Sequence, residues 1–123
     1  MTGRDALARL FEALEAGDFV RLAQVFAPNV TFRASLPDEI VEAGSASEAA
    51  ACFEDWFGDA AALQLLSTGS DELGDVTAFR YRMRAKGRSG WLVIQQAGAV
   101  EATNGRITAM RLACTGFQRE PSD

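Results

Sequence analysis

Apolar residues recur at helical spacing in the first part of the chain. From Arg4 to Ala16, leucine and phenylalanine side chains follow one another at intervals of three and four residues, which is the repeat of an amphipathic helix. Gly17 suits the left-handed conformation that ends a helix, and Asp18 suits the position that caps the next one. We therefore predict one helix over 4–16 and a second over 19–26.

The middle of the chain has the pattern of a short strand, a loop and a third helix. Branched and aromatic residues over 30–33 are typical of a strand. The segment 36–44 contains Pro37 followed by Asp38, which is typical of a loop, here one over the mouth of a cavity. A third helix is predicted over 47–57, and its buried side is expected to carry Ala51, Cys52, Trp56 and Phe57.

Apolar and polar residues alternate through most of the last half of the chain, which predicts consecutive strands. One strand opens at 63–69, and three more follow at 76–83, 91–96 and 105–112. The dipeptide Asn104-Gly105 before the last strand is the strongest short-range signal for a β-hairpin. Helices first and antiparallel strands afterwards indicate one α+β domain over the 123 residues, with 1–3 and 119–123 expected to fray.

These three strands, together with the helical segment that ends in Glu15-Ala16-Gly17-Asp18, resemble the NTF2-like superfamily. That superfamily includes ketosteroid isomerases and SnoaL-type polyketide cyclases, and the resemblance covers about 7–117. It implies a cone-shaped, cystatin-like α+β fold in which a curved, mainly antiparallel sheet surrounds the N-terminal helices. An apolar cavity is expected between the helices and the sheet.

The resemblance also implies which side chains point into that cavity. The candidate ligand-binding set is Phe79, Tyr81, Met83, Leu92, Ile94, Gln96, Met110, Leu112 and Cys114 from the strands, with Leu10, Phe53 and Trp56 from the helices. Each residue alone has two interpretations, as core or as ligand contact. Together they form an apolar set with few polar groups, which is typical of a small-molecule site. We therefore predict a hydrophobic small molecule as the partner.

Gln96 is the polar residue of this set that matters most. A buried amide without hydrogen-bond partners costs about 1–3 kcal/mol. In ketosteroid isomerases the matching position carries a protonated carboxylic acid that donates to the substrate oxyanion. Gln96 either donates to a ligand in the same way or bonds to the backbone or to Tyr81. Both interpretations stay open.

The other groups of an isomerase are missing from their expected positions. The resemblance places the tyrosine and the general base at Leu10 and Ala34, whose side chains neither donate nor accept protons. Asp38 and Glu39 are the nearest carboxylates, and each is either solvated or able to reach the cavity as a base. Cys114 is expected to be inert. The resemblance favours isomerase, cyclase or dehydratase chemistry on an apolar carbonyl compound, with no catalytic residue assigned and turnover itself left open.

Composition narrows the possible partners. The net charge of −5 argues against nucleic-acid binding, which needs a basic surface. The chain has no histidine, and Cys52 and Cys114 lack metal-ligand spacing, so neither a metal nor a cofactor is expected. No apolar stretch approaches the roughly 20 residues of a membrane span, and the first residues lack the apolar segment of a signal peptide. A cytoplasmic location without a membrane partner is therefore predicted.

The second face of the predicted sheet suggests an alternative function. It carries Arg80, Arg82, Arg84, Trp91, Val93, Gln95 and Arg111. Tryptophan and arginine are enriched at protein contacts, and the superfamily commonly dimerises through this face. A C2 homodimer is therefore predicted in either case. The alternative to a small-molecule protein is a non-catalytic dimerisation or protein-interaction domain.

Overall fold

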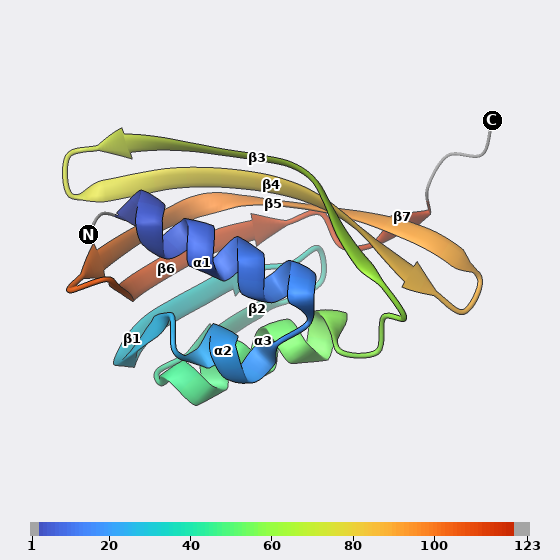
Figure 1. Ribbon diagram of the computed structural model, residues 1–123, viewed down its shortest axis with the longest axis horizontal. Coiled ribbons are helices and arrows are strands. Elements are labelled where there is room, and N and C mark those ends of the chain that lie inside the picture. The colour runs from blue at the N-terminus through green and yellow to red at the C-terminus, as the bar shows by residue number, and fades with distance from the viewer. Residues whose placement is uncertain (1–2, 120–123) are drawn as a thin grey trace.

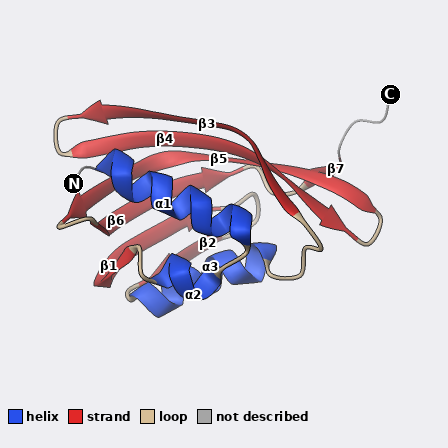
Figure 2. Ribbon diagram, viewed as in Figure 1, coloured by secondary structure: helices blue, strands red, loops and turns tan. Residues whose placement is uncertain are grey.

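Three helices lie against one side of a strongly curved sheet, as the computed structural model of residues 3–119 shows (Figures 1 and 2). The helices are α1 (Gly3–Ala16), α2 (Phe19–Ala23) and α3 (Ala46–Phe57). The strands are β1 (Phe26–Ser35), β2 (Ile40–Ala43), β3 (Leu63–Leu73), β4 (Val76–Gly87), β5 (Gly90–Thr103), β6 (Arg106–Cys114) and β7 (Gln118–Arg119). Within 3–119, no helix is long and apolar enough to cross a bilayer.

The ends of the helices follow the expected chemistry. Gly17 has a φ of 67°, the left-handed conformation that glycine adopts without strain. The Asp18 carboxylate accepts a hydrogen bond of 3.0 Å from the backbone N–H of Arg21, and so caps α2. Ser45 caps α3 by accepting from the N–H of Glu48 at 3.2 Å. The predicted first and third helices are confirmed.

The second helix is shorter than predicted. It ends at Ala23 instead of 26, because Phe26 already belongs to β1 and pairs with Ile107 of β6. The ladder between β1 and β6 is irregular between Phe26 and Thr31. Pro28, which lacks an N–H donor, lies within this irregularity, as expected for proline in a strand.

The predicted loop over 36–44 is wrong in its second half. Residues Ile40–Ala43 form β2, which runs antiparallel to β1 with Phe32 opposite Ala43 and Ser35 opposite Ile40. Only a short turn remains, closed by a 2.8 Å hydrogen bond from the N–H of Leu36 to the carbonyl of Glu39. The strand lies at the edge of the sheet, and its Ile40 is 55% exposed, so the usual apolar alternation is absent.

The sheet has the order β2-β1-β6-β5-β4-β3, with β7 paired to β5 outside this path. Among the strands of residues 3–119, only β1 and β6 run parallel to each other, so the predicted curved and mainly antiparallel sheet is confirmed. Asn104 and Gly105 have φ values of 54° and 79°, as the tight hairpin between β5 and β6 requires. Gly3 begins α1 and Arg119 ends β7, and 1–2 and 120–123 lie outside the described residues, so the predicted fraying of 1–3 and 119–123 stays a prediction.

Alternation sorts the side chains of β4 as predicted. Thr77, Phe79, Tyr81 and Met83 are buried beneath the helices, whereas Arg80 and Arg82 are exposed on the outer face. On α3 the buried side consists of Ala49, Ala50, Phe53 and Phe57. The predicted buried side was therefore wrong for Ala51, which is exposed, and for Cys52 and Trp56, which are only half-buried. The side of α3 that faces the core is rotated about the helix axis relative to the prediction. Phe53 stacks on Phe26 and packs against Phe32, which fixes α3 on β1.

Helix α1 is fastened to the sheet near its C-terminal end and in its middle. Near its end, Oε2 of Glu15 accepts a 2.9 Å hydrogen bond from the backbone N–H of Leu65. This bond lies at a bulge in β3, where the pairing with β4 shifts between Leu65 and Ser67. In the middle of the helix, the guanidinium of Arg9 donates to the carbonyl of Gly105 in the β5–β6 turn. The two contacts position α1 across the inner face of the sheet.

Candidate functional site

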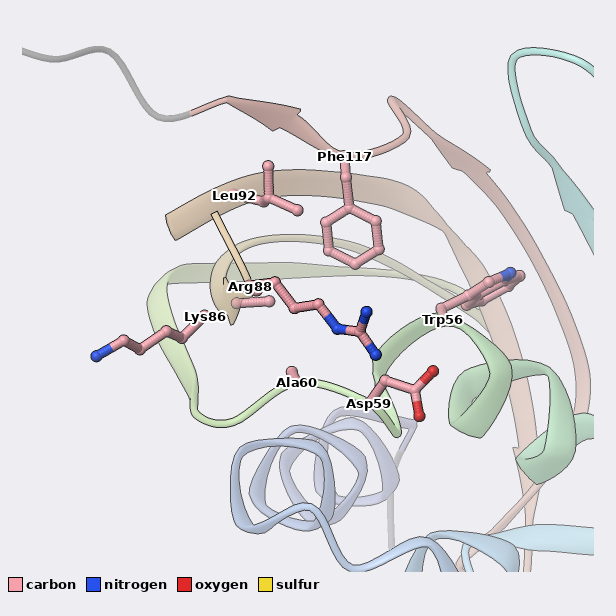
Figure 3. Close-up of a pocket in the computed structure, with 9 residues that line it drawn as sticks. Trp56, Asp59, Ala60, Lys86, Arg88, Leu92 and Phe117 are labelled. Atoms are coloured by element: carbon pink, nitrogen blue, oxygen red, sulfur yellow. The ribbon is translucent and has the colours of Figure 1, made fainter. Parts of the chain in front are cut away.

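A pocket of about 460 Å³ lies between the end of α3 and the turn that joins β4 to β5 (Figure 3). It is lined by Trp56, Asp59, Ala60, Ala85, Lys86, Gly87, Arg88, Leu92 and Phe117. These residues come from α3, the loop that follows it, the paired ends of β4 and β5, and the segment before β7. The pocket therefore combines apolar walls with three charged side chains.

Backbone hydrogen bonds join the two loops that border the pocket. The N–H of Ala61 donates to the carbonyl of Lys86, and the N–H of Lys86 donates to the carbonyl of Ala62, both at 2.9 Å. Gly87 and Gly90 pair directly, which leaves Arg88 in a tight hairpin turn. The loop after α3 is thus held beside the hairpin, and the charged side chains of both segments meet at the same opening.

The aromatic side of the pocket is supported by the hydrophobic core. Trp56 packs edge-on against Phe53, with ring centroids 5.1 Å apart. Phe117 packs edge-on against Phe57 at 5.7 Å. Phe53 and Phe57 are buried, so the two rings that line the pocket rest on side chains that do not move freely. Leu92 adds an aliphatic surface from β5.

The charged groups differ in where they point. Figure 3 shows the guanidinium of Arg88 turned into the pocket, between the ring of Phe117 and the carboxylate of Asp59. The ammonium of Lys86 points outward in the same view. Within residues 3–119, neither Arg88 nor Asp59 makes an ion pair or a side-chain hydrogen bond. One strong donor and one strong acceptor therefore remain available to a bound molecule.

The predicted site residues fall into two groups. Trp56 and Leu92 line the pocket. The others belong to the hydrophobic core that surrounds α1, namely Leu10, Phe53, Phe79, Tyr81, Met83, Ile94, Gln96, Met110, Leu112 and Cys114. A ligand contact for this second group stays a prediction.

The pocket also contains residues that sequence reasoning missed. Asp59, Arg88 and Phe117 lie in loops or beside a two-residue strand, where periodicity carries no signal. Gly87 and Gly90, on either side of Arg88, are typical of a turn. They did not indicate that this turn meets the loop after α3. That meeting depends on pairing between distant segments.

Gln96 is 1% exposed and lies in a chain of buried polar groups. The hydroxyl of Tyr81 donates to its Oε1, and its Nε2 donates to Sγ of Cys114 at 3.4 Å. The backbone N–H of Gly116 donates to the same sulfur at 3.3 Å. Burial, and secondarily the nearby Cys114, raise the pKa of Tyr81 well above its ordinary value. The amide thus has partners within the protein.

The positions that resemble those of an isomerase tyrosine and general base contain no proton donor or acceptor. Leu10 and Ala34 are fully buried in the core. Asp38 and Glu39 are exposed in the turn between β1 and β2, and neither lines the pocket. The nearest titratable carboxylate to the pocket interior is therefore Asp59, which belongs to the pocket itself.

Residues 7–110 match the sequence profile of the SnoaL-like domain. No curated protein sequence matches the chain. The profile match extends from the first turns of α1 to the middle of β6, and so covers most of the inner face of the sheet. Residues Asp59, Arg88 and Leu92 of the pocket lie inside it, whereas Phe117 lies beyond its end.

Solved structures share the same fold at low sequence identity. An NTF2-like protein of unknown function from Cytophaga hutchinsonii is 19% identical, with a TM-score of 0.65 over 96% of this chain and 91% of the other. A protein from Catenulispora acidiphila with a ketosteroid isomerase-like fold, in complex with trimethylamine, is 12% identical, with a TM-score of 0.72 over 91% and 85%. A cystatin-fold protein from Novosphingobium aromaticivorans is 9% identical, with a TM-score of 0.70 over 91% and 97%. The NTF2-like, cystatin-like fold is therefore shown.

Proposed function

Because the chain belongs to the SnoaL-like domain family, we propose that it binds a small, largely apolar organic molecule in the pocket between α3 and the β4–β5 turn. The observation that carries this proposal is the composition of the pocket wall. Two aromatic rings and an aliphatic side chain face a few convergent polar groups, which is the usual make-up of a small-molecule site. A volume of about 460 Å³ lies within the range of such sites.

The proposed ligand is a carbonyl compound, and isomerisation, cyclisation or dehydration are the reaction classes that fit it. These reactions develop negative charge on an oxygen atom, and a donor aimed at that atom stabilises the charge. Arg88 is the strongest such donor in the pocket. Trp56 and Phe117 would hold a planar molecule in one orientation, which is the second source of rate enhancement.

A thermal-shift screen tests the binding proposal. The library consists of hydrophobic carbonyl compounds, with steroids and polyketide fragments among them. A ligand at 100 times its Kd adds about 2.7 kcal/mol to the free energy of unfolding, which raises Tm by several degrees for a domain of this size. Ala60→Phe fills the pocket from its floor and should abolish the shift. Ala62→Phe, in the same loop but outside the pocket lining, is the matched control.

A second variant tests the predicted ligand contact of Gln96. Gln96→Leu should leave the ligand-induced Tm shift intact if the ligand lies wholly in the pocket beside Ala60. It should abolish the shift if the ligand reaches the buried side chains around Gln96 on the inner face of the sheet. No shift from any compound in a broad library would contradict the binding proposal and would favour an interaction domain.

The second candidate function is a C2 homodimer formed through the outer face of the sheet. On this face the guanidinium of Arg84 lies over the ring of Trp91, 3.9 Å from its centroid. Such an arginine–tryptophan pair is typical of protein contacts. Light scattering after size-exclusion chromatography should give a dimer at micromolar concentration. Ala97→Arg places a bulky charge on this face and should give a monomer, whereas a monomeric wild type would contradict the proposal.

The remaining partner and location statements stay predictions from the sequence. They are a cytoplasmic location and the absence of nucleic-acid and membrane partners. The net charge of −5 supports the first of these absences, because an acidic protein repels the phosphate backbone.

A further inference from the structure

The position of Arg88 carries information about the chemistry of the ligand. Its guanidinium is turned into the pocket in Figure 3, although the side chain begins at an exposed turn from which it could extend into water. The turn is short, because Gly87 and Gly90 pair directly on either side of it. The backbone of Arg88 is thereby held at the mouth of the pocket.

The formal charge of the pocket wall is positive. Lys86 and Arg88 carry positive charges and Asp59 carries the only negative charge among the lining residues. Within the described chain, Arg88 and Asp59 form no ion pair, either with each other or with another residue. A ligand with one negative charge would therefore neutralise the site, whereas a neutral ligand would leave a cation beside apolar walls.

A guanidinium serves two acceptors at once. It has five N–H donors in a planar fork, so one edge can bond to a ligand carboxylate while another faces Asp59. The ring of Phe117 lies on the other side of the group in Figure 3.

We propose that the ligand is an aromatic or similarly planar molecule bearing a single carboxylate, and that Arg88 selects it by binding that group. The planar body lies against Trp56 and Phe117, and the carboxylate meets the guanidinium at the mouth of the pocket. This inference rests on the proposed function, since it specifies the ligand class of the same pocket.

Two compounds of the same shape test it. 2-Naphthoate and 2-acetonaphthone share one planar body, but the first ends in a carboxylate and the second in a neutral methyl ketone. Binding is measured by titrating each into the isotope-labelled protein and following backbone and indole N–H signals by NMR. The indole of Trp56 lines the pocket, whereas that of Trp91 lies under Arg84 on the outer face and serves as an internal control.

The expected result is that wild type binds 2-naphthoate about tenfold more tightly than 2-acetonaphthone, because a hydrogen bond to a charged group is worth about that factor or more. Arg88→Gln should remove this preference, because it should weaken the binding of 2-naphthoate about tenfold more than that of 2-acetonaphthone. Arg88→Lys should keep part of the preference, because it retains the charge but not the planar fork. Arg33→Gln, an exposed cation on β1 outside the pocket, should change neither affinity.

Three results would overturn the inference. Equal affinities of wild type for the two compounds would show that the pocket does not distinguish a charged ligand from a neutral one, although the proposed function would stand. Equal weakening of both compounds in a folded Arg88→Gln protein would show a structural role for the arginine. If neither compound binds and the Trp56 indole signal does not shift, the result would contradict the proposal that this pocket binds a ligand of this kind.

Discussion

Tyr81 and Gln96 lie directly opposite each other on β4 and β5, and the hydroxyl of the first donates to the amide oxygen of the second. Both side chains are 1% exposed. Cys114 continues the chain by accepting from the same amide across the next pair of strands. A chain of hydrogen-bonded polar side chains thus crosses three strands on the inner face of the sheet. The stability of the surrounding core depends on these buried hydrogen bonds.

Breaking the pair from either side should destabilise the protein. Gln96→Leu leaves the Tyr81 hydroxyl buried without an acceptor, and we expect a loss of about 1–3 kcal/mol in the free energy of unfolding. Tyr81→Phe leaves the amide oxygen without its donor and should cost a similar amount. The double variant removes both partners and should be less destabilised than the two single losses together. Urea denaturation of all four proteins gives the coupling energy, and additive losses would contradict the bond.

Tyr81 should resist ionisation until the protein unfolds. Burial raises the pKa of its hydroxyl, so above about pH 10 the unfolded chain releases this proton while the folded protein keeps it. The contribution to stability is therefore complete below the unfolded pKa and falls as pH rises above it, by up to about 1.4 kcal/mol per pH unit.

The chain contains one tyrosine, so the absorbance of tyrosinate reports this residue alone. We expect the absorbance to rise together with the loss of the circular dichroism signal. Between about pH 10 and pH 11, the free energy of unfolding should decline less in Tyr81→Phe than in wild type, because the variant lacks the hydroxyl whose ionisation favours the unfolded chain. A tyrosinate signal in protein that is still folded would contradict the raised pKa.

Gly98 of β5 should not tolerate any side chain. A Cβ atom there would lie 1.8 Å from the backbone carbonyl oxygen of Arg111, which cannot rotate away. We expect Gly98→Ala to lower the free energy of unfolding by about 2–3 kcal/mol. Gly44→Ala is the matched control, because nothing lies within 4 Å of its added Cβ, and its stability should be close to wild type. Similar denaturation midpoints for the two variants would contradict the close approach.

Cys52 should react slowly with iodoacetamide at neutral pH. Burial raises the pKa of its thiol, and the negative charges of Asp55 and Glu48 add to this effect, so little of the reactive thiolate is present. In a Cys114→Ala background, Asp55→Asn should lower that pKa and increase the alkylation rate. Glu54→Gln, on the same helix, should leave the rate unchanged, and equal effects of the two variants would show that Asp55 has no specific influence.

Periodicity predicted those elements in which local pattern and tertiary packing agree. The leucines of α1 and the alternation along β4 are examples, because the same side chains that make the pattern are the ones the fold buries. Phe26 shows why other boundaries failed. An apolar residue satisfies a helical and an extended pattern equally well, and its pairing with Ile107 from the end of the chain decides between them.

The candidate site divides in the same way. Trp56 and Leu92 were found because they belong to regular elements with an apolar side. Arg88 and Asp59 were not, because each lies in a loop whose sequence shows only a turn. Their proximity follows from the hydrogen bonds between Ala61 and Lys86, and such pairing across distant segments has no local signature.

The parallel pairing of β1 with β6 has a consequence for biosynthesis. On the ribosome, β1 emerges early but must wait for β6, because β6 is the last strand of the path β2-β1-β6-β5-β4-β3 to be synthesised. Until then the phenylalanines of β1 can be covered only by α3. A nascent chain that stalls before Arg106 could pair β1 with β2 on one edge, but the other edge of β1 would be open to chaperones and to other nascent chains. The topology thus delays closure of the sheet until β6 has been synthesised.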